Sequence, residues 1–215
     1  MPELLGTIAY RTKTRLPAAG ADDSIRHVNR VKDMITRRAF GVIAFALPAV
    51  MAARLAAAET PVKAEKNPPG DIPDDQVFIA YASPLGFALK VPEGWARTDR
   101  ADGVVFADKY GRIEVSVTMG EPQTPQTAID AVKASLRAVE IKKAESTDRP
   151  AGRAIYIAFD SNSEPNAVTN KQIRLENDRY LFAKDGKVAS VTFSAPKGAD
   201  NADQWLMMSK SFLWR

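Results

Sequence analysis

Apolar and polar residues alternate in short runs along most of the chain after Val77. In the run GFALKV, the apolar residues Phe87, Leu89 and Val91 fall on one side, and small or charged residues fall on the other. Such alternation is typical of β-strands with one buried face. Further predicted strands are GVVFAD (103–108), RIEVSVTM (112–119), AIYIAF (154–159), KQIRLE (171–176), RYLFAK (179–184) and KVASVTFSA (187–195).

Short polar runs separate these strands. In PEGW (92–95), Pro92 can preset φ and Gly94 can adopt an unusual backbone angle, which predicts a turn. The runs END (176–178) and KDG (184–186) predict two tight connections. The last three strands are therefore expected to form a ladder of β-hairpins.

Two helices are predicted from apolar residues that recur three or four positions apart. The first starts after Thr124, a possible cap, with Pro125 at its first position. Its apolar face comprises Ile129, Val132, Leu136 and Val139, and Lys142 and Lys143 suit its C-terminal end.

The second helix follows GADNADQW (198–205), in which Asn201 and Gln204 have the spacing of a capping box. Its predicted buried face comprises Trp205, Met208 and Phe212. About seven strands and two helices without βαβ alternation predict an α+β fold, in which helices pack on a central antiparallel sheet.

An export signal is predicted before this domain. Arg37 and Arg38 precede a run without charges, 39–53, that is too short to span a bilayer of ~30 Å comfortably. Ala56 and Ala58 occupy the small-residue positions of a cleavage site, which predicts processing before Glu59. The segment 34–58 resembles a twin-arginine signal peptide and indicates a periplasmic or otherwise exported protein. The alternative is a buried or membrane-anchoring helix, which Pro48 would interrupt.

Residues 1–33 precede this signal, and we interpret them as a non-native extension or a disordered leader, with Met34 as the start of translation. An organelle transit peptide, which would place the domain in the thylakoid lumen, is the alternative. Its acidic residues argue against it, since transit peptides are acid-poor. Residues 59–76 contain four prolines and charges of both signs, which predicts a flexible linker without a core before the domain 77–215.

The charge balance differs between the leader and the rest of the chain. The whole chain has 30 Lys and Arg against 26 Asp and Glu; nine and four of these lie in residues 1–58, leaving 21 and 22 in residues 59–215. The mature part, with a net charge of −1, lacks the basic surplus of a nucleic-acid-binding protein. The chain has no cysteine, and its single histidine, His27, lies in the leader, so the usual thiolate and imidazole chemistry is excluded from the mature part.

The run GFALKVPEGW, an alternating strand, an amphipathic helix and the closing SFLWR resemble the PsbP-like family over roughly residues 78–215. The second half resembles a bacterial branch described as lipoproteins. The matching positions are Gly86, Pro92, Gly94, Trp95, Thr169, Lys171, Arg179, Tyr180, Gly186, Lys187, Gly198, Asp200, Asn201, Trp205, Ser211, Phe212 and Trp214. The resemblance implies an α/β/α sandwich around an antiparallel sheet, an exported location and a non-catalytic role. The chain has no lipid-accepting cysteine, and its lack of histidine in the domain weakens any manganese- or calcium-related role.

The polar loop 160–172 and its neighbours are the predicted binding region, because loops longer than about 12 residues are often functional. The candidate ligand or partner residues are Asn170, Lys171, Arg179, Tyr180 and Trp95. Their alternative roles are solvent-exposed charge pairs for the two basic residues and core packing for the tryptophan. The spacing of Ser194 and Lys197 matches a serine–lysine motif, but the partner motifs of that fold are missing.

The sequence therefore predicts an exported, non-enzymatic module that binds or assembles a protein partner at the cell envelope, with no cofactor and no metal. The alternative is a carrier of a small apolar ligand in a pocket between sheet and helix. A hydrolase that uses paired carboxylates is a third hypothesis, since linear sequence does not show which carboxylates lie together.

Overall fold

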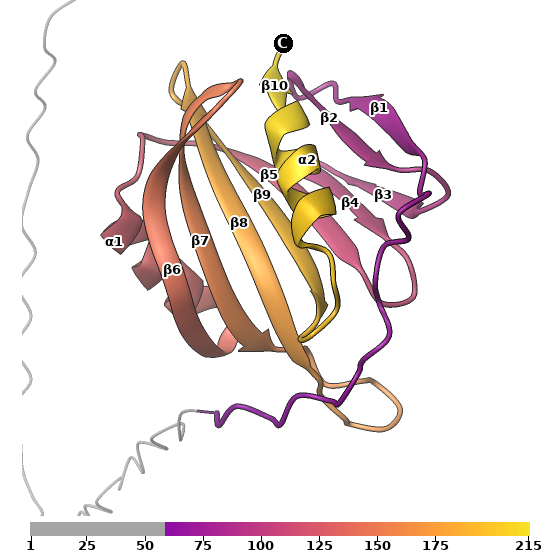
Figure 1. The fold of residues 1–215 in the computed structure, drawn as a ribbon. Helices are drawn as coiled ribbons and strands as arrows, with labels where there is room; N and C mark the ends of the chain where they lie inside the picture. Colours follow the sequence, from indigo (N-terminus) through magenta and orange to yellow (C-terminus); the bar gives the residue numbers. More distant parts are fainter. Residues whose placement is uncertain (1–58) are drawn as a thin grey trace, which may run out of the picture. The chain divides into compact units, whose positions relative to one another are not determined.

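The computed structural model describes residues 59–215 (Figure 1). The predicted export signal, with Arg37, Arg38, Ala56 and Ala58, lies outside the described residues, so its assignment stays a prediction. Among residues 59–215, no helix has the length and apolar character needed to cross a membrane.

Ten strands and two helices make up the described part of the chain. In order, they are β1 (Phe78–Ala82), β2 (Phe87–Pro92), β3 (Ala96–Arg100), β4 (Gly103–Ala107), β5 (Arg112–Met119), α1 (Pro125–Ser135), β6 (Arg137–Arg149), β7 (Gly152–Asn162), β8 (Arg174–Lys184), β9 (Lys187–Pro196), α2 (Ala202–Ser211) and β10 (Leu213–Trp214).

Two antiparallel sheets carry the fold. Seven strands pair in the order β3-β4-β5-β9-β8-β7-β6, and β1, β2 and β10 form a smaller sheet. Helix α2 and the smaller sheet lie over one face of the large sheet, whereas α1 lies over the other face next to β6 and β7 (Figure 1). The predicted antiparallel sheet with helices is therefore present, but the described part of the chain is mostly β. The predicted sandwich has a helix on each face of the sheet, whereas here one face is covered by α2 together with a second, smaller sheet.

Each face of the large sheet has its own apolar core, because neighbouring residues of a strand point to opposite faces. On the α2 face, Tyr180 and Phe182 of β8 pack with Phe212. On the α1 face, Leu181 of β8 packs with Val132 of α1. Strand β2 also packs on the α2 face. Its residues Phe87, Leu89 and Val91, which were predicted to form a buried side, are buried in this core.

Two predicted turns are confirmed by the backbone. Gly94 has φ 84°, and the connection between β8 and β9 places Asp185 at φ 50° and Gly186 at φ 72°. Positive φ at both central residues is the geometry that a two-residue hairpin requires, and Asp-Gly supplies it at little cost. The KDG run is therefore a tight hairpin turn, as predicted.

The first predicted helix is too long. Helix α1 begins after Thr124, whose side-chain oxygen accepts a hydrogen bond from the Thr127 amide, but it ends at Ser135. Residues 137–149 form strand β6, which pairs with β7 along its length with two register shifts. The apolar residues of this stretch fit both a helical and an extended period, and pairing with β7 decides for the strand.

The predicted END turn is also wrong, because β8 runs without interruption through it. Asn177 is only 4% exposed, and its amide nitrogen donates to the Phe159 carbonyl (3.2 Å) and to Ser161 Oγ (3.0 Å). Its amide oxygen accepts a hydrogen bond of 2.6 Å from Ser194 Oγ. A polar residue that resembles a turn signal therefore lies inside the sheet, since neighbouring strands satisfy its side chain.

Strands β1 and β3 were not predicted. All five residues of β3 are exposed, so its sequence carries no alternation between buried and exposed positions. Strand β3 lies at one edge of the large sheet and pairs only with β4. Its extended shape comes from this pairing, which the sequence pattern does not reveal.

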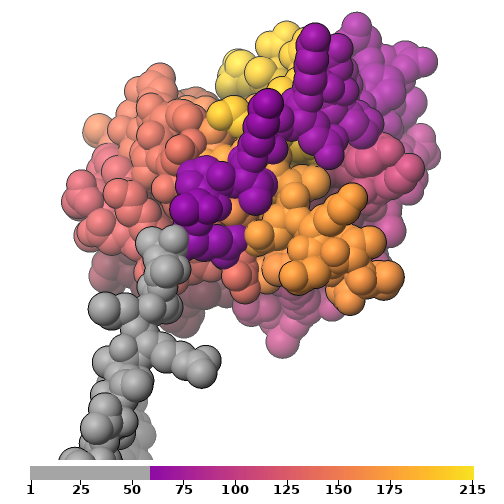
Figure 2. All heavy atoms as spheres, turned by 90° about the horizontal axis from the view of Figure 1, so that it is seen from below, coloured from indigo at the N-terminus to yellow at the C-terminus, as the bar shows by residue number. Residues whose placement is uncertain are grey.

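The sequence predicts that residues 59–76 are a flexible linker without a core. They contain no helix or strand, but they lie along the surface of the domain (Figure 2). Ile72 is 5% exposed and belongs to the α2-face core. Its amide donates to Asn201 Oδ1 (2.6 Å), and the Gly70 carbonyl accepts from Asn201 Nδ2 (3.0 Å). Asn201 therefore binds this segment and does not cap α2 through its side chain, and the predicted capping box with Gln204 is absent.

Candidate functional site

The structure separates the residues that the sequence grouped as a binding site. Asn170 and Lys171 are exposed in the connection between β7 and β8. Tyr180 is buried in the α2-face core, where its ring stacks on Tyr156 at 4.9 Å. Trp95 is half-buried against the same core. Only Arg179 lines a cavity on the α1 face, and the five residues do not form one site.

The loop between β7 and β8 is shorter than predicted, because residues 160–162 belong to β7. Asn166 organises it, since its side-chain oxygen accepts hydrogen bonds from the amides of Val168 (3.0 Å) and Thr169 (2.9 Å). Asn170 has φ 54°, a conformation that asparagine tolerates well. The loop is therefore a compact polar turn, with Val168 93% exposed at its surface.

A polar cavity of about 230 Å³ lies between the large sheet and α1. Strands β5, β8 and β9 form its floor, and α1 contributes only the small side chains of Ala128 and Ala131. The other lining residues are Glu114, Ser116, Thr118, Gln123, Arg179, Leu181, Val188, Ser190 and Thr192. Because the helix contributes only small residues, an open space remains above the polar side chains of the strands.

Arg179 is the positive charge of this cavity. Its Nε donates a hydrogen bond of 2.9 Å to Thr192 Oγ1, and its Cζ lies 5.6 Å from the centre of the Phe159 ring. Among residues 59–215, neither terminal nitrogen has a hydrogen-bond partner, and no carboxylate lies within ion-pair distance. The carboxylate of Glu114 is engaged by Arg100 (2.6 Å) and Arg112 (2.8 Å).

Burial lowers the pKa of Arg179, and the charge of Glu114 partly opposes this effect. The guanidinium nevertheless stays protonated, because arginine does not lose its proton in proteins. Its terminal nitrogens are not among the buried polar atoms that lack a partner, so solvent reaches them and an anion can reach them too. Planar guanidinium groups bind carboxylates and phosphates through two parallel hydrogen bonds.

Hydroxyl groups from two strands line the floor beside this charge. Ser116 of β5 lies opposite Ser190 of β9, and Thr192 lies opposite Glu114 and Arg179 in its two neighbouring strands. Hydroxyl groups can donate to an anion or accept from a neutral group. The cavity therefore combines the cation of Arg179, the paired carboxylate of Glu114 and several adaptable hydroxyl groups.

A second cavity of about 340 Å³ adjoins the first and shares Gln123, Leu181 and Val188 with it. Its remaining lining residues are Pro122, Ser146, Arg153, Ala154, Ile155 and Ala183, and most of this lining is apolar. The polar cavity alone is smaller than a typical ligand site of roughly 300–1,000 Å³, and the two together reach that range.

The opposite face of β8 carries acidic side chains in a pocket of about 350 Å³ next to α2. Burial is the main cause that raises the pKa of Glu176 and of Asp178. Here each carboxylate has a partner: Tyr156 Oη donates to Asp178 (2.9 Å), and the Gly198 amide donates to Glu176 (3.3 Å). Among the described residues, no three acidic side chains are placed to hold a metal ion.

The serine–lysine spacing near the end of β9 does not form a catalytic pair. Ser194 donates its hydroxyl proton to Asn177, and the Lys197 ammonium forms a 2.5 Å ion pair with Asp160. Trp205 is buried and stacks on Phe193 with ring centres 6.1 Å apart, which is a core role. These side chains stabilise the fold and present no nucleophile with a base.

The sequence singled out Arg179 but missed the groups around it, among them Thr192, Ser190 and Gln123. Their strands alternate cleanly, so their polar sides were interpreted as facing solvent. A usable signal was present: Ala128 on the buried side of the helix and Ala131 at its exposed edge are both unusually small. A small-residue helix face over a polar strand face leaves room for a cavity.

No protein-family model and no curated protein sequence matches this chain. Among solved structures, PsbP (CyanoP) from Synechocystis sp. PCC 6803 is similar with 15% identity and a TM-score of 0.48, over 68% of this chain and 98% of that chain. A Bacteroides thetaiotaomicron VPI-5482 protein has 12% identity and a TM-score of 0.43, over 63% of this chain and 48% of that chain. A protein of unknown function from Pseudomonas aeruginosa has 12% identity and a TM-score of 0.42, over 64% of this chain and 97% of that chain. At these low scores the likenesses carry no functional argument, and membership of the PsbP-like family stays a prediction from the sequence.

Proposed function

We propose that this protein is an exported, non-enzymatic module that binds an amphipathic carboxylate in the groove between α1 and the large sheet. The observation that carries the proposal is Arg179, which lines the polar cavity and whose terminal nitrogens have no hydrogen-bond or ion-pair partner among residues 59–215. The carboxylate takes the position of the missing counter-ion. Binding is specified by this charge and by the neighbouring hydroxyl groups.

The shape of the groove supports a ligand with an apolar tail. Beyond Arg179, the shared residues Leu181 and Val188 lead into the mostly apolar second cavity. Arg179 and Ala183 are four residues apart on β8, which corresponds to about 13 Å along a strand. An acyl chain of medium length fits this distance, with its carboxylate at one end.

The one carboxylate that lines the polar cavity, Glu114, is paired with Arg100 and Arg112 and is not free to act as a base. An arginine holds its proton, and the serine and threonine hydroxyl groups need an activating base to act as nucleophiles. Residues 59–215 contain neither histidine nor cysteine. These features support a binding role over an enzymatic one.

Isothermal titration of the purified chain with octanoate, octanol and acetate tests the proposal. We expect octanoate to bind best, because it alone supplies both the charge and the tail. Arg179→Ala should weaken octanoate binding at least tenfold, and Arg179→Lys should recover part of the loss because lysine keeps the charge but lacks the planar fork. Equal affinities of octanoate for the native chain and the Arg179→Ala variant would overturn the proposal.

Lys171→Ala is the matched control, because it removes an exposed charge from a different part of the chain. The start of β8 at Arg174 is five residues from Arg179, about 16 Å along the strand, and Lys171 lies beyond that start. Octanoate binding should therefore not change in this variant.

The binding of a protein partner is a second candidate function, favoured by the exposed Val168 next to Asn170 and Lys171 on the β7–β8 loop. Crosslinking in the native envelope with the two single variants separates the two functions. A partner held by the loop should be lost with Lys171→Ala and kept with Arg179→Ala. A partner lost with neither variant would exclude the loop charge and the groove as its contact site.

A further inference from the structure

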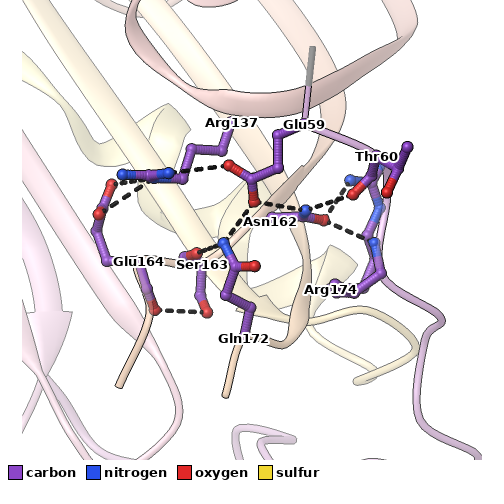
Figure 3. Close-up of polar contacts among 9 residues, drawn as sticks. Glu59, Thr60, Arg137, Asn162, Ser163, Glu164, Gln172 and Arg174 are labelled. Carbon is purple, nitrogen blue, oxygen red and sulfur yellow. Dashed lines mark hydrogen bonds and ion pairs between the residues drawn. The ribbon is translucent and has the colours of Figure 1, made fainter. Parts of the chain in front are cut away.

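Residue Glu59, the first of the described residues, is held at three points by the domain (Figure 3). Its carboxylate accepts hydrogen bonds from Arg137 Nη1 (2.9 Å), Asn162 Nδ2 (3.0 Å) and Gln172 Nε2 (2.5 Å). These donors come from the start of β6, the end of β7 and the loop before β8. Three segments that are all far from Glu59 in the sequence therefore converge on its side chain.

Asn162 extends this grip to the residues that follow. It is only 4% exposed, and its Nδ2 also donates to the Thr60 carbonyl (2.9 Å). Its Oδ1 accepts from the Val62 amide (3.0 Å) and from Arg174 Nη1 (3.0 Å). One buried amide thus binds the side chain of Glu59 and the backbone on both sides of Pro61.

Neighbouring residues hold Asn162, Arg137 and Gln172 in place. Arg174 is buried, donates to the Ala138 carbonyl (2.7 Å) and pairs with Glu140 (2.8 Å). Arg137 also pairs with Glu164 (3.2 Å), and Gln172 also donates to the Ser163 carbonyl (3.0 Å). Groups held in this way lose little freedom when a ligand binds, so the site is preorganised.

We infer that the domain has a dedicated docking site for residues 59–62, which holds the N-terminus of the mature protein after the predicted cleavage before Glu59. The site recognises an acidic first residue and two backbone groups of an extended segment. In a chain cleaved before Glu59, the new N-terminus is therefore held in place on the domain. The inference is independent of the proposed carboxylate groove, because it uses different residues on a different part of the domain.

A second attachment strengthens the argument. Residues 70–72 are held by Asn201, and Ile72 lies in the core. Lys63 and Lys66 lie between the two attachments and are exposed. Trypsin binds an extended stretch on both sides of the bond that it cuts, so release of residues 59–62 from the domain should raise the rate of cleavage after Lys63.

Limited trypsin digestion of the full chain, followed by intact-mass spectrometry, tests the docking site. Glu59→Ala removes all three hydrogen bonds to the carboxylate, and Glu65→Ala is the matched control because Glu65 is exposed in the same segment. We expect cleavage after Lys63 to be about tenfold faster in Glu59→Ala than in the native chain. Cleavage after Arg54, which precedes the docked residues, should keep its native rate in both variants.

Two further outcomes decide the inference. Equal rates after Lys63 in the Glu59→Ala and Glu65→Ala variants would overturn it. Asn162→Ala should accelerate the same cleavage at least as much as Glu59→Ala, because it releases the backbone of residues 60 and 62 as well. A folded Asn162→Ala variant, judged by its circular dichroism, that keeps the native rate after Lys63 would also overturn it.

Discussion

Asp178 and Arg179 are neighbours on β8, yet their surroundings differ. Asp178 faces α2, where Tyr156 donates a hydrogen bond to it. Arg179 faces α1, where its terminal nitrogens have no partner among residues 59–215. The carboxylates of Asp178 and Glu176 on the α2 face are thus satisfied within the chain. The charge on the α1 face is the group that we propose binds a ligand.

The largest effect is expected from breaking the α2 face. Phe212 is fully buried there and stacks on Phe182 with ring centres 4.3 Å apart. Phe212→Ala should lower the free energy of unfolding by about 3–5 kcal/mol through lost packing and a residual cavity. Urea unfolding followed by tryptophan fluorescence checks this value, and a loss below about 1 kcal/mol would contradict a tightly packed α2 face.

A smaller effect of opposite sign is expected on the α1 face. Arg179→Met keeps most of the side-chain volume and removes a partly buried charge without a counter-ion. The free energy of unfolding should rise by about 1 kcal/mol, while octanoate binding should be lost. The same urea titration, without ligand, measures the change. A clear loss of stability would show that Arg179 serves the fold and would remove the contrast between the two faces.

The smallest effects are expected from pH, and they differ in sign between two regions. The hydrogen bond from Asn162 is the main cause that lowers the pKa of Glu59 from 4.5 to about 2. Docking of residues 59–62 is therefore fully stabilised above pH 4.5 and is lost as the pH falls toward 2. The chemical shift of the Val62 amide should report this transition, and Glu59→Gln should abolish its pH dependence.

Glu176 and Asp178 act in the opposite direction, because burial raises their pKa above the values of the unfolded chain. The folded state therefore binds more protons in this window, and the contribution of these two groups to stability falls as pH rises from their unfolded pKa values through their folded ones. Asp178→Asn should flatten this part of the pH profile in urea unfolding at several pH values. An unchanged profile would show that burial does not control this carboxyl group.

Local patterns predicted the elements whose cause is local. The alternation at Phe87, Leu89 and Val91 indicates a strand with one buried face, and the pair Asp185-Gly186 is typical of a tight hairpin turn. Strand β6 and the position of Asn177 do not follow from a local pattern. The apolar residues of β6 fit both a helical and an extended period. Asn177 is typical of turns, but here groups of strands β7 and β9, distant in the sequence, form the hydrogen bonds of its side chain.

The candidate site was predicted only in part for the same reason. Arg179 and Tyr180 were grouped because both lie near the polar loop 160–172, although the two-residue period of a strand places adjacent side chains on opposite faces. Applied to β8, this rule separates them without a structure. The cavity itself depends on where α1 crosses the sheet, and no local pattern fixes that position.

The two outer strands of the large sheet also affect how copies of the protein meet. Strand β3 presents only exposed side chains, with Arg97, Asp99 and Arg100 among its five residues, and β6 is interrupted by two register shifts and carries charges along its length. Charges and irregular backbone hinder another strand from adding to an edge. A concentrated solution of the protein therefore resists growth into β-linked aggregates.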